Sequence, residues 1–163
     1  MNVTALHQYS YPLDQVICAF WDIDFYKAKF EAVGARNIAV ISEERTDDAF
    51  ALVIEREVPL EGVPGALKTF LGAWNKIRQS ERWEQAGDEY FNELEIAAAG
   101  VPVDLRGTMM LRPEGAGCVN DVHIEVSCSV PLVGHKLMEF VAENTQRGLA
   151  EEYRVINEYF ANR

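Results

Sequence analysis

The chain of 163 residues carries 26 acidic and 15 basic side chains, which gives a formal net charge of −11 at pH 7. This excess of carboxylates excludes binding to nucleic-acid phosphates and opposes attraction to anionic membranes. A hydrophobic content of 48% excludes disorder and predicts a single domain over residues 1–163. No apolar run reaches the roughly 18–20 residues of a membrane span, so we expect no membrane insertion. Three widely spaced cysteines predict reduced thiols and a cytoplasmic location.

The chain opens with a strand and two short helices. Residues 2–11 predict a strand, which ends at a proline because proline cannot donate to a ladder. Apolar residues then recur at helical spacing around 16–21. A second helix follows the N-cap candidates Asp22 and Asp24 and stops at Gly34.

Six further strands and one long helix complete the predicted order. The strands are alternating, β-branched runs over residues 38–44, 50–58, 75–85, 90–98, 104–113 and 118–130. Their short glycine-containing connections predict antiparallel hairpins. Only Pro64–Leu71 interrupts the series, as a short helical segment. Residues 132–160 predict one long helix, whose apolar stripe needs the sheet as its partner. The fold class is therefore α+β.

Several short motifs accompany this order of elements. They are Tyr11-Pro12-Leu13-Asp14, Asp24-Phe25-Tyr26-Lys27-Ala28-Lys29-Phe30, Arg56-Glu57-Val58-Pro59, Glu81-Arg82-Trp83, Gly100-Val101-Pro102 and Val130-Pro131-Leu132-Val133-Gly134. Together with the element order they resemble the START/Bet v 1-like superfamily, which has the helix-grip fold and includes polyketide cyclases (SRPBCC) and lipid-transfer domains. More narrowly, they resemble a bacterial family of unassigned function within it.

The resemblance implies a curved antiparallel sheet of about seven strands around the long C-terminal helix, with two short helices after the first strand. It also implies an elongated apolar cavity between sheet and helix, with Pro64–Leu71 near its mouth. It carries no accepted catalytic residues, so none is transferred to this chain.

Strand alternation predicts which side chains face the interior, and two charged residues are among them. Arg56 shares its phase with Ile54, and Glu81 shares its phase with Trp83. A charge directed at an apolar interior is unfavourable unless it is paired, so each is the candidate partner of the other. The two either form a structural ion pair that sets strand register or line a pocket, where they bind a polar head group or transfer a proton.

The candidate ligand-binding residues combine this pair with inward apolar positions. They are Arg56, Glu81, Trp83, Phe70, Leu94, Ile96, Met109, Leu111, Ile124, Val126, Leu137 and Val141. The same alternation places His123 on the solvated face and Cys128 among buried apolar residues. No metal-ligand spacing and no nucleotide-binding motif occurs, so we expect neither a metal nor a cofactor.

Three functions fit these observations. The leading hypothesis is a carrier or sensor that binds a small hydrophobic molecule, with its polar end held by Arg56. The second is an enzyme of the cyclase, aromatase or dehydratase kind, in which Glu81 is the general acid/base. The third is a co-chaperone-like adaptor whose acidic surface attracts a basic protein partner. The sequence identifies neither the ligand, nor a protein partner, nor the oligomeric state, and whether any reaction is catalysed stays open.

Overall fold

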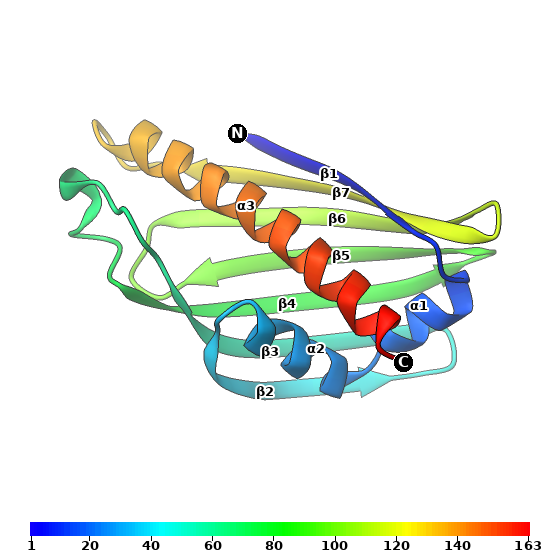
Figure 1. Ribbon diagram of the computed structural model, residues 1–163. Helices are drawn as coiled ribbons and strands as arrows, with labels where there is room; N and C mark the ends of the chain where they lie inside the picture. The colour runs from blue at the N-terminus through cyan, green and yellow to red at the C-terminus, as the bar shows by residue number, and fades with distance from the viewer.

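The computed structural model describes residues 1–163, which form one antiparallel sheet, three α-helices and one short 3-10 turn (Figure 1). In chain order the elements are β1 (Asn2–Tyr9), α1 (Leu13–Phe20), α2 (Ile23–Ala32), β2 (Arg36–Arg45), β3 (Ala49–Pro59), η1 (Gly65–Leu67), β4 (Trp74–Ala86), β5 (Glu89–Ala98), β6 (Val103–Glu114), β7 (Gly117–Cys128) and α3 (Gly134–Ala161). The predicted order of elements is confirmed.

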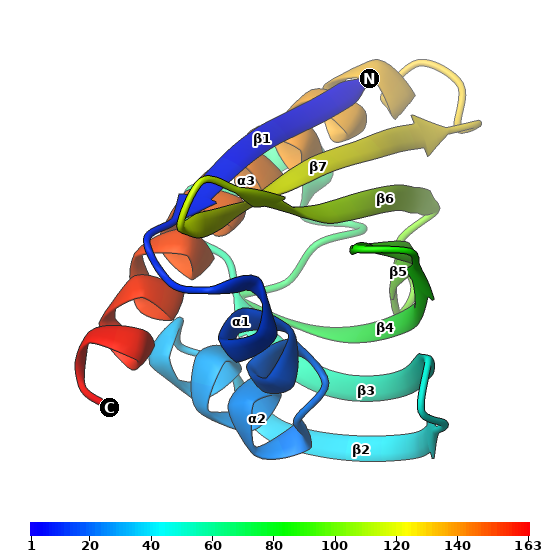
Figure 2. The same cartoon turned by 90° about the vertical axis from the view of Figure 1, so that its right-hand side faces the viewer.

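All seven strands belong to one sheet, in the order β1-β7-β6-β5-β4-β3-β2. Each strand from β2 to β6 pairs antiparallel with the next strand along the chain. β7, the last strand, also pairs antiparallel with β1. The sheet curves, and α3 crosses its concave side while α1 and α2 cover the part near β2 and β3 (Figure 2). This curved seven-stranded sheet with its long C-terminal helix is the helix-grip architecture.

Local chemistry explains where the short helices begin and end. Asp22 caps α2, since its carboxylate accepts a hydrogen bond from the backbone N–H of Asp24 at 2.9 Å. Gly34, with a φ of +93°, allows the chain to leave α2 and enter β2. Both features agree with the sequence signals at these positions.

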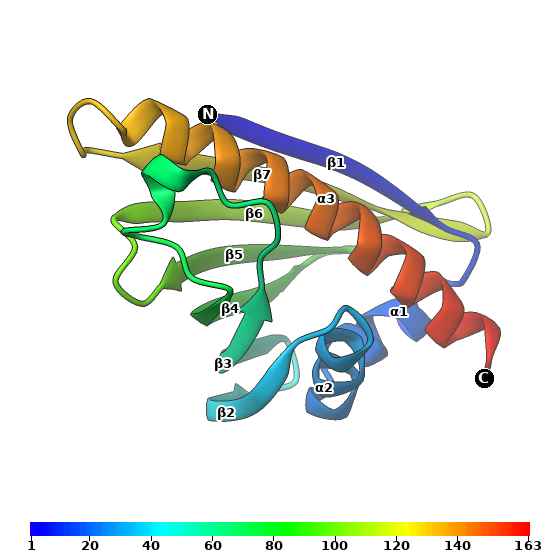
Figure 3. The same cartoon turned by 60° about the vertical axis from the view of Figure 1, so that its left-hand side comes forward.

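Most predicted boundaries differ from the structure by one or two residues, and two differences are informative. β1 ends at Tyr9 instead of residue 11, because its last partner is Cys118 and β7 begins one residue earlier, at Gly117. The segment Pro64–Leu71 contains only the 3-10 turn Gly65–Leu67 and no α-helix. Its Leu67 and Leu71 are nevertheless buried, which anchors the β3–β4 connection beside the N-terminal end of α3 (Figure 3).

The interior between sheet and helices is divided into two apolar clusters. The larger cluster joins α1, α2 and the C-terminal end of α3 to β3 and β4, and it is rich in aromatic residues such as Phe25, Phe30 and Trp83. The smaller cluster joins α3, from Leu137 to Leu149, to β1, β5, β6 and β7, and it includes the fully buried Leu94. Polar side chains lie between the two clusters, and this boundary contains the candidate site.

Side chains of α3 also tie it to β1, which is an edge strand of the sheet. The Tyr153 hydroxyl donates to the carbonyl of Gln8 at 2.6 Å, and the Gln146 amide donates to the carbonyl of Thr4 at 3.3 Å. None of the three helices, α3 included, has the long uncharged apolar stretch that a bilayer-spanning helix needs.

Candidate functional site

A buried carboxylate on the inward face of β4 organises the polar boundary. Glu81 is 5% exposed and accepts four hydrogen bonds. The donors are the Tyr26 hydroxyl at 2.6 Å, the Gln79 amide at 2.5 Å, the Trp83 indole at 2.9 Å and the Asn92 amide at 3.2 Å. Three of these bonds go to Oε2 and one, from Gln79, goes to Oε1, so both oxygens of the carboxylate are engaged.

Arg56 lies on β3 and points to the same inward face of the sheet. It is two inward side chains beyond Leu52, the residue of β3 that pairs with Glu81. Its Nη2 donates to the Gln79 side-chain oxygen at 3.0 Å, and its Cζ lies 3.8 Å from the centre of the Phe30 ring. Arg56 and Glu81 do not form the direct ion pair expected from the sequence. The register pairs Arg56 with Ile77 and Glu81 with Leu52, so Gln79 bridges the two charges.

Burial leaves the Arg56 guanidinium incompletely satisfied. Burial lowers the pKa of Arg56, while the negative charges of Glu152 and Glu81 raise it. Its Nη1 is buried and has no hydrogen-bond partner. Arg56 is therefore held by the Gln79 oxygen and the Phe30 ring on β3's inner side, away from solvent.

A second charged pair joins α2 to α3. Lys29, 8% exposed, places its Nζ 3.2 Å from Oε2 of the half-buried Glu152. The Lys29 ammonium also lies 4.9 Å from the Tyr26 ring centre and 4.7 Å from that of Phe30. The interior therefore holds two cations, Arg56 and Lys29, and two anions, Glu81 and Glu152, so its formal charges balance.

A small cavity lies between these polar groups and α3. Its volume is about 30 Å³, and it is lined by His7, Tyr9, Phe20, Tyr26, Lys29, Glu81, Trp83, Met109, Asn120, Val122, Leu149, Glu152 and Ile156. A cavity of this size holds about two water molecules. It is much smaller than the elongated cavity that the resemblance implies, because large side chains such as Trp83 and Leu149 occupy the space between sheet and helix, and its wall mixes apolar with polar and charged side chains.

Two polar atoms at this cavity have no partner. The Tyr9 hydroxyl and the Asn120 side-chain oxygen are buried and make no hydrogen bond. Burying a polar atom without a partner is costly, and such atoms in a folded protein call for an explanation. The sequence leaves open which face of the first strand points inward, which hides Tyr9, whereas Asn120 shares the inward phase of Val122 and could have been found by the same alternation.

His7 forms part of the cavity wall, and its burial predicts that the stability of the protein depends on pH. Its ring stacks on Tyr153 with centres 4.5 Å apart, and burial lowers the pKa of His7 from 6.5 against the opposing effect of Glu152. The unfolded chain therefore binds a proton that the folded chain does not, so stability falls as the pH drops through and below 6.5.

We expect His7→Phe to remove this part of the pH dependence and to keep the stacking. Urea denaturation at about pH 7.5 and about pH 5.5 measures the change in unfolding free energy between the two conditions. His123→Gln is the matched control, because His123 is exposed on the other face of the sheet. An unchanged pH dependence in His7→Phe would contradict the assignment.

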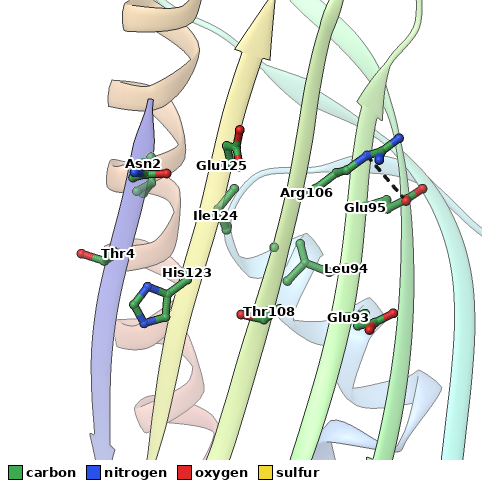
Figure 4. A pocket seen from close by; sticks show the side chains of 12 residues that line it. Asn2, Thr4, Glu93, Leu94, Glu95, Arg106, Thr108, His123, Ile124 and Glu125 are labelled. Carbon is green, nitrogen blue, oxygen red and sulfur yellow. Dashed lines mark ion pairs between the residues drawn. The ribbon is translucent and has the colours of Figure 1, made fainter.

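The outer face of the sheet carries a larger, open depression of about 540 Å³ (Figure 4). Figure 4 shows its polar side chains standing on β1, β5, β6 and β7, with an ion pair of 3.7 Å between Arg106 and Glu95. His123 lies here, exposed as the alternation predicts. The depression contains no buried polar atom without a partner, so it is a weaker candidate for a ligand site.

The predicted ligand-binding residues fall into three groups. Glu81, Trp83 and Met109 line the small cavity. Arg56 and Leu111 are buried nearby but do not line it. The remaining residues belong to or pack against the smaller apolar cluster: Phe70, Leu94, Ile96, Ile124, Val126, Leu137 and Val141. Three of the predicted residues therefore meet at the small cavity. The structure adds Tyr9, Asn120, Lys29 and Glu152 to its wall.

The arrangement of charged and nucleophilic groups contains no metal-binding cluster. No group of three or more His, Cys, Asp or Glu side chains converges in the structure. The three cysteines are unpaired, and Cys128 is half-buried against the smaller apolar cluster. Burial raises the pKa of the Cys118 thiol to about 11, which keeps it protonated at neutral pH.

Comparison with solved structures places the fold in the START and Bet v 1-like class. The protein TTHA0849 from Thermus thermophilus matches with a TM-score of 0.66 and 16% identity, covering 97% of this chain and 95% of that one. Ara h 8.0201 matches with a TM-score of 0.62 and 9% identity, covering 100% and 99%. The STAR-related lipid transfer protein (fragment 25-204) from Xanthomonas axonopodis matches with a TM-score of 0.54 and 15% identity, covering 93% and 84%. These likenesses establish the fold.

The family is established by sequence. Residues 4–160 match the family described as "protein of unknown function (DUF2505)", and the chain belongs to that family. No curated protein matches the chain.

Proposed function

We propose that the protein binds a small hydrophobic molecule between the sheet and α3, as a carrier or a sensor. The observation that carries the proposal is the cavity beneath α3, whose wall holds the unpartnered Tyr9 hydroxyl and Asn120 oxygen. Among the proteins of the same fold, the one from Xanthomonas axonopodis is a STAR-related lipid transfer protein, which supports the same kind of ligand here.

The packing of α3 supports a route into the cavity. Organic ligands occupy sites of about 300–1,000 Å³, so a cavity of about 30 Å³ requires α3 to move outward before one binds. Leu137 and Leu149 of α3 are buried, but no residue from Met138 to Gly148 is. The middle of α3 is therefore attached to the sheet by few buried side chains.

The same part of α3 carries side-chain hydrogen bonds to its own backbone. The Asn144 amide donates to the carbonyl of Phe140, and the Thr145 hydroxyl donates to that of Val141, each at 2.8 Å. Such bonds to the preceding turn bend helices. Gly148 adds a helix-destabilising residue that has no packing reason, since a Cβ there would meet nothing within 4 Å. We infer that α3 bends at residues 144–148 when a ligand enters.

Gly148→Ala is expected to stabilise the protein by about 0.5–1 kcal/mol, because alanine favours the helix and fits the open space. Urea denaturation measures this gain. If α3 bends here, the substitution should also slow the association of an apolar fluorescent probe in stopped-flow mixing. A stabilised protein with an unchanged association rate would place the route elsewhere.

The proposed function is tested by native mass spectrometry of protein purified from its own host, together with titration of an apolar fluorescent probe. We expect a co-purifying small molecule and saturable probe binding. Val122→Ile adds one methylene group at the cavity wall and should weaken probe binding, whereas Val53→Ile adds the same group on the outer face of β3 and should not. No bound molecule and no probe binding would refute the proposal.

The enzyme hypothesis for Glu81 receives no support from this geometry. A general acid/base must present a free lone pair or proton to its substrate. Both oxygens of Glu81 already accept hydrogen bonds from surrounding side chains: Oε2 accepts three, among them those from Tyr26 and Trp83, and Oε1 accepts one. Glu81 is better suited to hold α2, β4 and β5 together than to transfer a proton.

A further inference from the structure

Two unpartnered atoms define a specific polar subsite in the cavity. Tyr9 and Asn120 are each 3% exposed, and both line it. The β1–β7 register pairs His7 with Asn120 and Tyr9 with Cys118, so Tyr9 and Asn120 are diagonal neighbours on the inward face. Side chains in this relation are close enough to contact one small group between them.

The free hydrogen-bonding capacity of this subsite is one donor and one acceptor. Burial raises the pKa of Tyr9 far above its ordinary value of 10.0, so the phenol keeps its proton and can donate it. The Asn120 amide nitrogen faces the Met109 sulfur at 3.6 Å, which leaves the amide oxygen as the unused acceptor. A ligand that satisfies both atoms must accept one hydrogen bond and donate another. A hydroxyl group does both.

The surrounding charges select against an ionised ligand group. Glu81 is satisfied by four donors, and Lys29 is paired with Glu152. Arg56 does not line the cavity. A carboxylate or an ammonium brought into this cavity would be a buried charge whose possible counter-ions in the wall, Lys29 and Glu81, already have partners, which is unfavourable.

We propose that the ligand of this protein is a neutral hydrophobic alcohol, whose hydroxyl accepts a hydrogen bond from Tyr9 and donates one to Asn120. This inference rests on the proposed function, because the apolar part of the alcohol must lie in the space that α3 opens. It assigns Tyr9 and Asn120 as the residues that select the polar group. Arg56, which the sequence favoured for this role, then has a structural one.

The test compares ligands that differ only in their polar group: octanol, its isomer methyl heptyl ether, octanoate and octylamine, each titrated calorimetrically into the full chain. The ether accepts a hydrogen bond but donates none. We expect octanol to bind roughly five- to tenfold tighter than the ether, since it makes one more buried hydrogen bond. Octanoate and octylamine should bind more than tenfold weaker than octanol.

Two variants then separate the two hydrogen bonds. Asn120→Leu should make octanol and the ether bind equally, because the hydroxyl loses its acceptor. Tyr9→Phe should weaken octanol and the ether by a similar factor and keep their ratio. Both variants should stay folded, since each removes a polar atom that has no partner in the protein. Tyr11→Phe is the matched control, because Tyr11 does not line the cavity.

The possible results separate this inference from the proposed function. Equal binding of all four ligands, or tightest binding of octanoate or octylamine, would overturn the alcohol assignment and leave hydrophobic binding intact. An octanol preference that survives in Asn120→Leu would remove Asn120 from the subsite, and unchanged affinities for octanol and the ether in Tyr9→Phe would remove Tyr9. If no ligand and no apolar probe binds, the cavity holds water only, and both proposals fall together.

Discussion

Glu81→Ala is expected to lower the free energy of unfolding by about 3–5 kcal/mol, the largest effect of any single substitution in the polar boundary. The carboxylate accepts hydrogen bonds from Tyr26, Gln79, Trp83 and Asn92, and its removal leaves these buried donors without an acceptor. It also removes a negative charge that stabilises the buried Arg56. Urea denaturation measures the loss.

Two further variants test the physical reason for this loss. Glu81→Gln keeps one acceptor and should be destabilised less than Glu81→Ala. Arg56→Met should be destabilising in the native background but less so beside Glu81→Ala, because the charge it removes is then already unbalanced. Additive losses would show that the two charges do not interact through Gln79. A stable Glu81→Gln that loses only a chemical activity would instead restore the acid/base hypothesis.

Gly107→Ala is expected to destabilise the protein by about 1–3 kcal/mol, although it adds only one methyl group. A Cβ at Gly107 would lie 2.5 Å from the carbonyl oxygen of His123 and 2.9 Å from Cγ1 of Ile124. The first contact is with the backbone of the neighbouring strand, which cannot move aside without disturbing the β6–β7 ladder. The absence of a side chain at Gly107 therefore permits β6 and β7 to approach closely here.

Gly148→Ala is the matched control for Gly107→Ala, since the same substitution in open space is expected to stabilise. The two variants should therefore shift the midpoint of urea denaturation in opposite directions. Gly107→Ala should also raise the amide hydrogen exchange of β6 and β7 around the contact. A destabilisation of less than about 0.5 kcal/mol would mean that the sheet relaxes around the methyl group, contrary to this account.

Most of the fold is predictable because its signals are local. The alternation in residues 118–130 identifies the inward face of β7, and the structure buries Val122, Ile124 and Val126 as expected. Glycine-containing turns predict the hairpins, and the apolar stripe of residues 132–160 predicts α3 within a few residues at each end. The errors are at segment ends, where the pairing partner decides: β1 ends at Tyr9, beside the residue at which β7 begins.

The candidate site is less predictable because it depends on register and on contacts between distant segments. Alternation alone identifies Arg56 and Glu81 as inward charges, and both are buried. It cannot reveal that Gln79 lies between them, since that follows from the pairing of β3 with β4 across a long connection. Nor can it reveal Lys29 and Glu152, which come from two helices and meet only after both have packed.

By itself, then, the sequence determines the class of fold, the inward faces of the strands and the presence of unusual interior charges. Each follows from the periodicity of hydrophobic and polar residues, which is a property of short segments. Only the tertiary structure decides that the cavity is small, that the interior charges balance, and that Tyr9 and Asn120 in the cavity wall are left without partners. These properties depend on residues that are far apart in the chain, and only packing brings their atoms close together.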